Sequence, residues 1–382
     1  MQKKLIALAI AGLSGAAFAQ SNVTLSGLVD VGYFSQSIQT AGIADTKTYA
    51  AANNSATSQL NITITENIGN GMNVKFFGET DWAPASNNSV LLNSYNYLEL
   101  AGSWGALRGG NLNTDALYAT IGAQPFGTGI GSGISGSFGR LSRVGSNGTF
   151  GAANAATGGI TTEGEQIFTA GLNAGAGSRS VRVNNSIQYS SPVFSGFSGS
   201  LQLAKQNDDS TVAAAGTTAA FQSLGLKYNN GPINVYYVNE VTKAGSVAAP
   251  ANAAGLGANE KVTHNILTGN YTFGPATIYA GWTSSKSAGV AVQTADARSW
   301  NLGLKYNVTG ALSLAAQVLK VDDKLAGSDK DRNLNALGLD YALSKRSTAY
   351  VRYETGDNDR STATGNGVGS FTRWGAGLRH SF

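Results

Sequence analysis

The residues that could do chemistry in this chain are charged side chains spaced at alternate positions within short segments. Lys75 and Glu79 share one parity, and Glu99, Arg108 and Arg182 hold equivalent positions in other segments. Alternate residues of a β-strand point to the same face of the sheet. Such a face would carry charges of both signs along a surface that water reaches, where it could orient and sort charged solutes.

Catalytic and metal-binding residues are scarce. The 382 residues include no cysteine and two histidines, so a disulfide framework or a thiolate site is excluded. His264 has polar parity within a predicted strand and is expected to be a wall residue, whereas His380 has apolar parity near a rim. No phosphate-cradling or calcium-binding loop is found. We therefore expect no enzyme and no cofactor.

The elements that must position the charged residues are strands, because apolar and polar residues alternate with period two along the chain. Leu60-Asn61-Ile62-Thr63-Ile64 and Leu302-Gly303-Leu304-Lys305-Tyr306 are clear examples. Sixteen such segments are predicted, about the length of a tilted membrane strand. They are 22–34, 56–67, 71–81, 91–101, 104–111, 180–190, 198–206, 221–229, 232–243, 261–273, 276–285, 298–307, 311–322, 331–343, 347–356 and 370–382.

The connections between these segments are asymmetric. Seven are short, and the eight that alternate with them are mostly longer. The long ones are 35–55, 82–90, 112–179, 207–220, 244–260, 286–297, 323–330 and 357–369. All six prolines fall in connections or at the first residue of a segment, which agrees with the strand map. Short turns on one rim and long loops on the other are typical of a closed outer-membrane barrel.

Membrane insertion as a barrel fits the remaining composition. Residues 1–19 have a basic start, an apolar stretch and an Ala17-Phe18-Ala19 site, which predicts a cleaved signal peptide. After it no run of about 18 apolar residues occurs, so the alternatives are a soluble all-β protein and a closed barrel. Aromatic residues of apolar parity cluster at segment ends, which favours two girdles at the membrane interfaces.

The opposite parity is too polar for a dry core. It includes many charged residues, among them Asp30, Lys227, Glu240, Asp340 and Arg352. Burying these dry would cost several kcal/mol each unless all were paired, so a water-filled lumen is expected. A 16-stranded barrel is wide enough for such a channel. The predicted fold is an all-β, antiparallel, 16-stranded transmembrane β-barrel over residues 20–382.

Composition agrees with this interpretation. The 50 glycines follow no strict period and are assigned to turns, loops and close packing against a wall. Basic residues number 26 and acidic residues 22, and removal of Lys3 and Lys4 with the signal peptide would leave a formal charge of +2. Both signs are dispersed without a basic run, so nucleic acid is not an expected partner.

Several motifs resemble those of the trimeric general porins of Gram-negative outer membranes, in the beta-proteobacterial version. They are the opening strand 21–30, Asn184-Asn185-Ser186-Ile187-Gln188-Tyr189 with Ser190-Ser191-Pro192, the stretch 337–347, and the ending Gly377-Leu378-Arg379-His380-Ser381-Phe382. The resemblance implies a homotrimer in outer-membrane lipid and lipopolysaccharide that passes small hydrophilic solutes and inorganic ions. It also implies short periplasmic turns, long extracellular loops, and recognition of Phe382 by the barrel assembly machinery.

The resemblance further implies that the third long loop, 112–179, folds into the lumen and forms a constriction. The expected cations are Lys75, Arg108 and Arg182 on the wall, with Arg140 and Arg143 on the loop. The expected carboxylates are Asp115, Glu79 and Glu99. Gln59 and Asn111 stand where relatives often carry arginine, so two pore cations of the family would be absent.

Three functional hypotheses follow. The first is a diffusion channel with a mild preference for anions, based on the charge of +2 and the lumen cations. The second is a substrate-specific channel in which the third loop forms a dedicated solute site. The third is an outer-membrane enzyme that uses His264 beside a serine, or an adhesin.

Overall fold

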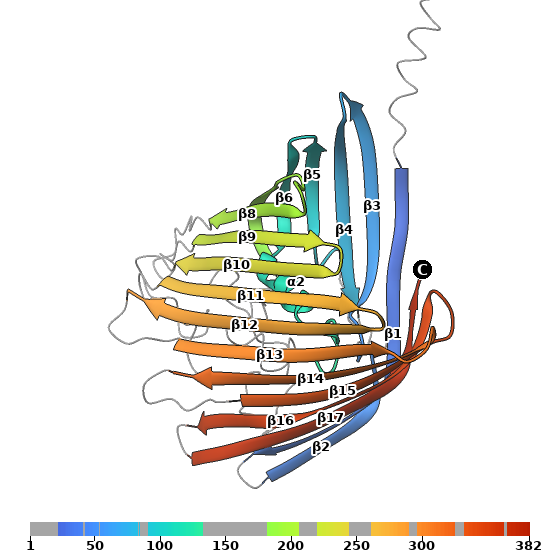
Figure 1. Cartoon of the computed structure of the whole chain (residues 1–382), viewed down its shortest axis with the longest axis vertical. Helices are drawn as coiled ribbons and strands as arrows, with labels where there is room; N and C mark the ends of the chain where they lie inside the picture. Colours follow the sequence, from blue (N-terminus) through green and yellow to red (C-terminus); the bar gives the residue numbers. More distant parts are fainter. Residues whose placement is uncertain are drawn as a thin grey trace, which may run out of the picture.

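The computed structural model describes residues 22–40, 43–52, 54–82, 84, 91–132, 182–205, 220–243, 261–289, 296–324, 332–362 and 365–382 (Figure 1). The predicted signal peptide 1–19 lies outside these residues. The chain folds into β-strands and one short described helix, α2 (Asp115–Gly122). The strands are β1 (Asn22–Thr40), β2 (Ile43–Ala52), β3 (Ser58–Gly69), β4 (Met72–Trp82), β5 (Asn96–Gly102), β6 (Gly105–Asn113), β7 (Arg182–Ser190), β8 (Phe197–Lys205), β9 (Ala220–Asn230), β10 (Ile233–Lys243), β11 (Lys261–Phe273), β12 (Ala276–Ala288), β13 (Asp296–Asn307), β14 (Leu312–Asp323), β15 (Arg332–Ala342), β16 (Ser347–Thr362) and β17 (Gly365–Ser381).

All strand pairings among the described residues are antiparallel, consecutive strands from β3 to β17 pair with each other, and β1 pairs with β17 to close the sheet. β2 and β3 both pair with β1 and follow each other along it, so the 17 named strands fill sixteen positions around the barrel. The predicted 16-stranded antiparallel barrel is therefore confirmed. The seven predicted short turns also join strands at one rim, for example at Gly231 between β9 and β10 and at Gly274 between β11 and β12.

The predicted long connections 35–55 and 357–369 are wrong in extent. β1 and β2 extend their ladder from the Val31–Ala52 pair to the Thr40–Ile43 pair, and β16 pairs with β17 as far as Thr362–Gly365. The residues of these extensions do not alternate regularly between apolar and polar types. Hydrophobic periodicity cannot detect a strand of that kind.

The outward face carries the apolar parity. Exposed residues on it include Leu226, Leu302, Leu304 and Leu337, each between inward-facing neighbours. Tyr271, Phe273 and Tyr306 lie outward near the short turns. Trp282, Trp300 and Trp374 also lie outward, further along β12, β13 and β17. Aromatic side chains are therefore present at two levels of the surface that would contact lipid. Among the described residues, no helix is long and apolar enough to span a membrane.

The two ends of the barrel sequence meet at the seam. Phe382 accepts a backbone hydrogen bond from Gly27 N (3.1 Å) and donates one to Gly27 O (3.0 Å). A Cβ on Gly27 would lie 2.4 Å from the carbonyl oxygen of Gln59 and 2.6 Å from Cζ of Phe382. Glycine is therefore required where the last aromatic ring covers the first strand.

Candidate functional site

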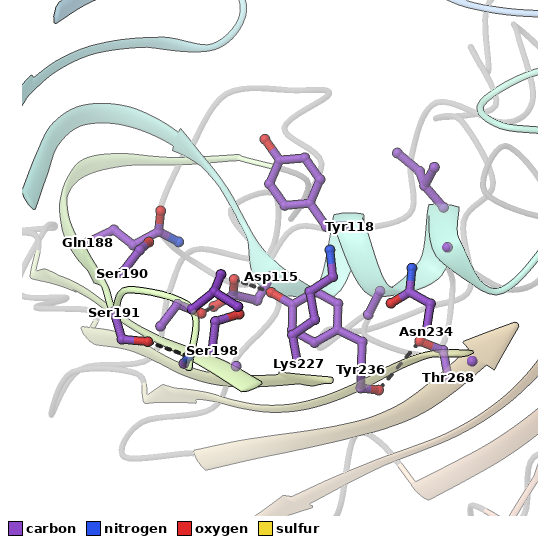
Figure 2. A pocket seen from close by; sticks show the side chains of 18 of the residues that line it. Asp115, Tyr118, Gln188, Ser190, Ser191, Ser198, Lys227, Asn234, Tyr236 and Thr268 are labelled. Carbon is purple, nitrogen blue, oxygen red and sulfur yellow. Dashed lines mark hydrogen bonds between the residues drawn. The ribbon is translucent and has the colours of Figure 1, made fainter. Parts of the chain in front are cut away.

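The helix α2 belongs to the segment that follows β6, and it lies against the inner wall of the barrel (Figures 1 and 2). Ala116 and Ala119 pack on Val238 and Ile266, which point inward from β10 and β11. Thr114 begins the helix, because its hydroxyl accepts a hydrogen bond from Leu117 N. The described part of the predicted loop, 112–132, therefore folds into the lumen as expected. Residues 133–179 lie outside the described part.

Inward polar groups of the wall complete the hydrogen bonds of the helix ends. Ala116 N donates to Glu240 Oε1 (3.2 Å), so a carboxylate lies at the positive end of the helix dipole. At the other end Asn270 donates to Gly122 O (3.0 Å) and Asn301 donates to Ala123 O (2.6 Å). A helix this short is marginal in isolation. The wall therefore fixes both its presence and its position.

Beyond α2 the segment continues around the inner wall to the strands near the seam. Phe126 inserts into an inward apolar cluster from β14, β15 and β17; its members are Leu319, Val321, Leu334, Ala336 and Phe371. Gly131 N donates to Glu354 Oε2 (2.6 Å), and Ile130 N donates to Asn54 O (2.8 Å). The lumen is thus not uniformly polar, because an apolar patch is present where the segment docks.

A series of inward glycines gives the docked segment its place on the wall. A Cβ added to any of them would lie within 3.2 Å of a residue in 115–130. The pairs are Gly225 with Asp115, Gly281 with Ala123, Gly303 with Pro125, Gly338 with Phe126 and Gly375 with Ile130. We call these five residues the glycine track. It confirms the prediction that some strand glycines allow close packing of the loop against the wall.

The remaining wall, from β3 to β7, carries the predicted cations in ion pairs. Glu99 on β5 binds Lys75 Nζ through Oε1 (2.7 Å) and Arg108 Nε through Oε2. Both cations also lie over the Tyr97 ring, at 5.5 and 5.4 Å from its centroid. The Tyr95 ring packs beside Tyr97, with 4.7 Å between the ring centroids.

A second cluster lies nearer the rim from which the long segment starts. Arg182 Nη2 binds Glu79 Oε1 (3.1 Å) and Asp81 Oδ2 (3.0 Å). Gln59 donates to the other oxygen of Asp81 (3.2 Å), and Ser94 donates to Glu79. Gln59 thus takes part in the cluster as a neutral donor. Asp81 was not among the predicted residues, although it shares the parity of Lys75 and Glu79.

The paired charges differ in how far they reach the water of the lumen. The side chains of Lys75, Arg108 and Arg182 are 28%, 25% and 20% exposed. Glu99 and Glu79 are 7% and 8% exposed, and Asp81 is 26% exposed. Two of the three carboxylates therefore lie behind the cations that they bind. A solute passing this wall meets more of the positive groups than of the negative ones.

Asp115 differs from its expected place opposite these cations. Its Oδ1 accepts from Tyr236 OH (2.6 Å), and its Oδ2 accepts from Ser200 (2.9 Å) and Ser223 (3.3 Å). The carboxylate therefore points to β8–β10 and fixes α2 to the wall (Figure 2). Of the other predicted site residues, Lys75, Glu79, Glu99, Arg108, Arg182 and Gln59 come together as above. Arg140 and Arg143 lie outside the described residues.

Sequence reasoning placed a third group of charges inward but did not predict how they pair. Arg352 binds Asp340 (2.7 Å) and Ser55 (3.1 Å), and Arg373 binds Glu354 (3.0 Å). The alternation of inward and outward residues along β15–β17 was the sequence signal that placed these charges inward. His264 is buried on the inward face of β11, opposite Glu240 in register. Within the described residues, no group of three or more His, Asp or Glu side chains could hold a metal ion.

Comparison with known sequences agrees with this geometry. The Gram-negative porin family profile matches residues 5–361. The chain is 28% identical to an outer membrane porin protein of Bordetella pertussis, over 96% of this chain and 99% of that protein. It is 26% identical to outer membrane porin protein 32 of Delftia acidovorans, over 92% of this chain and 88% of that one. The expected likeness to beta-proteobacterial porins is thereby confirmed.

Solved structures agree on the fold. An anion-selective porin from Comamonas acidovorans superposes with a TM-score of 0.72 and 22% identity, covering 95% of this chain and all of that one (100%). OmpT of Vibrio cholerae in its trimer form gives 0.59 and 13% identity over 95% and 99% of the two chains. Porins of this family are typically trimeric and non-enzymatic. The closed barrel, the segment docked in its lumen and the family match together show that this chain belongs to the Gram-negative porin family and forms a channel in the outer membrane.

Proposed function

We propose that the chain is a homotrimeric diffusion channel for small hydrophilic solutes, with a mild preference for anions. The constriction is formed between the docked segment 114–132 and the opposite wall of β3–β7. Lys75, Arg108 and Arg182 are its charged lining, and Arg140 and Arg143 are proposed as further cations from the same loop. The observation that most supports the anion preference is the unequal exposure of cations and carboxylates on that wall.

The preference is mild because the wall is close to neutral. Three cations face Glu79, Asp81 and Glu99 over short distances, so their fields cancel a few ångströms away. Only the outermost groups act on a passing ion, and these are mainly cationic. The predicted charge of +2 after loss of the signal peptide acts in the same direction. The anion-selective porin of similar fold is consistent with this proposal.

The homotrimer rests on what is typical of the family and on the trimer form of a protein with the same fold. Each barrel is closed on itself, so each subunit would carry its own pore. Subunits that conduct independently should close one at a time. A trimer would then show three equal conductance levels.

Reconstitution of the mature protein into planar lipid bilayers tests the proposal. We expect stepwise conductance in groups of three and a reversal potential on the anion side under a KCl gradient. Absence of ion conductance would overturn the channel assignment, whereas isolated single steps would overturn only the trimer. A reversal potential on the cation side would overturn only the anion preference.

A further inference from the structure

A cavity of about 390 Å³ lies between α2 and the wall, on the side of the helix that faces the short turns. Its lining includes Ser191 and Val193 of the β7–β8 turn and Asn234 near the start of β10. The helix itself rests on Val238, which is further from that turn. The size is that of pockets that hold small molecules. The cavity therefore forms a side pocket of the lumen below the constriction.

The charge of this pocket is positive. Lys227 on β9 is half-buried, points toward α2 (Figure 2), and has no ion-pair partner among the residues that the structure describes. Its Nζ lies 5.9 Å from the Tyr236 ring centroid. Arg108 lines the pocket from β6 and shares its one carboxylate with Lys75. The single acidic residue in the lining is Asp115, whose two oxygens already accept three hydroxyl groups.

The rest of the lining is rich in hydroxyl and amide groups. Ser198 and Asn234 point into the pocket (Figure 2), and their side chains have no hydrogen-bond partner within the described part of the chain. Gln188 uses its Oε1 to accept from Arg108, which leaves its amide group to donate. The Tyr118 and Tyr236 side chains line the same space. Such a lining suits a ligand that has several hydroxyl groups and C–H groups that can pack against an aromatic ring.

We propose that this pocket binds a small hydroxylated monocarboxylate, a sugar acid in chemical class. The carboxylate binds the Lys227 ammonium, the hydroxyl groups bind Ser198, Asn234 and Gln188, and C–H groups of the carbon chain pack against Tyr118 and Tyr236. The inference rests on the proposed diffusion channel and adds a solute class to it. Solutes of this class would dwell below the constriction instead of passing freely.

Gluconate tests the pocket in planar bilayers that hold the full mature channel at constant KCl. We expect gluconate to reduce the current with a saturable dependence on its concentration. Glucose lacks the carboxylate and acetate lacks the hydroxyl groups, so each should block far less. Equal block by glucose would overturn the role of Lys227, and equal block by acetate would overturn the role of the hydroxyl lining.

The chain offers a matched control, because Leu224-Gly225-Leu226-Lys227-Tyr228 and Leu302-Gly303-Leu304-Lys305-Tyr306 have the same sequence. Lys305 is also half-buried and inward-facing, but it does not line the pocket. Lys227→Gln should raise the half-blocking gluconate concentration about tenfold, the effect of losing one close charge in a partly wet site. Lys305→Gln removes the same charge, and its half-blocking gluconate concentration should equal that of the parent channel.

A second variant removes the space rather than the charge. Ser198→Phe fills the pocket from β8 and should abolish gluconate block. Equal block in the parent, Lys227→Gln and Ser198→Phe channels would overturn the pocket, as would a parent channel that conducts without any gluconate block. A parent that does not conduct would instead refute the proposed channel, so the two failures are distinguishable.

Discussion

Arg182 offers the sharpest test of the proposed preference for anions. Its guanidinium is 20% exposed and covers Glu79, which is 8% exposed, while also binding Asp81. Substitution by glutamine keeps a hydrogen-bonding side chain but removes the charge. The local cluster then carries two carboxylates without a cation. We therefore expect Arg182→Gln to shift the channel toward cations.

The size of this shift follows from Coulomb's law with screening. An ion about 10 Å away feels a unit charge in water at about 0.4 kcal/mol, and one Debye length of 0.1 M salt reduces this to about 0.15 kcal/mol. Anions and cations feel opposite signs, so their relative free energy changes by about 0.3 kcal/mol. The anion-to-cation permeability ratio should therefore fall by a factor of about 1.7.

The assay is the reversal potential of reconstituted channels under a KCl gradient. Lys345→Gln is the control, because Lys345 lies in the turn between β15 and β16, away from the wall formed by β3–β7. It removes the same formal charge and should leave the ratio unchanged. Repeating the measurement near 1 M salt, where the Debye length is about 3 Å, should make the effect of Arg182→Gln nearly vanish.

Two results would refute this reasoning. If both variants keep the parental reversal potential in dilute salt, the exposed guanidinium does not act on passing ions. If Arg182→Gln increases the preference for anions, removing this guanidinium does not act on passing ions as the loss of a positive charge from the wall.

Three further variants test other parts of the structure. Glu99→Gln releases its two cationic partners and should raise the anion-to-cation ratio by a similar factor of about 1.7, read from the reversal potential; an unchanged ratio would contradict the proposed lining. Phe126→Ala should cost about 3–5 kcal/mol of loop docking and give larger, noisier currents; currents as quiet as those of the parent would speak against the apolar anchor. Gly27→Ala should destabilise the barrel by about 1–3 kcal/mol in thermal melts, because its Cβ would overlap Phe382; Gly109→Ala, where no atom lies within 4 Å, is the control, and equal melting of the two would exclude a tight seam.

The strands were predictable from the sequence wherever one face contacts lipid and must therefore be apolar. In β13 the outward residues Trp300, Leu302 and Leu304 alternate with inward Asn301 and Gly303, so the pattern is strict. Beyond the part of each strand that contacts lipid, outward residues need not be apolar. The extensions of β1 with β2 and of β16 with β17 were therefore missed, because their residues do not alternate regularly between apolar and polar types.

Which charged side chains face the lumen was predictable from the sequence, whereas their pairing was not. Parity placed Lys75, Glu99 and Arg108 on the inward face. Which carboxylate binds which cation depends on register between strands, and parity along one strand does not fix that register. The direction of Asp115 depends on α2, a helix of 8 residues held by wall groups such as Glu240, and its own sequence gives no strong helical signal.

The glycine track also bears on how the barrel reaches one register. A strand that slips by two residues keeps every apolar side chain toward lipid, so the membrane cannot distinguish the slipped barrel from the native one. The glycine track does distinguish the two barrels. A slip of two residues in β13 would place Asn301 or Lys305 at the position of Gly303, which contacts Pro125, and the segment could not pack against the wall. The docked segment therefore fits only a wall whose strands are in their native register.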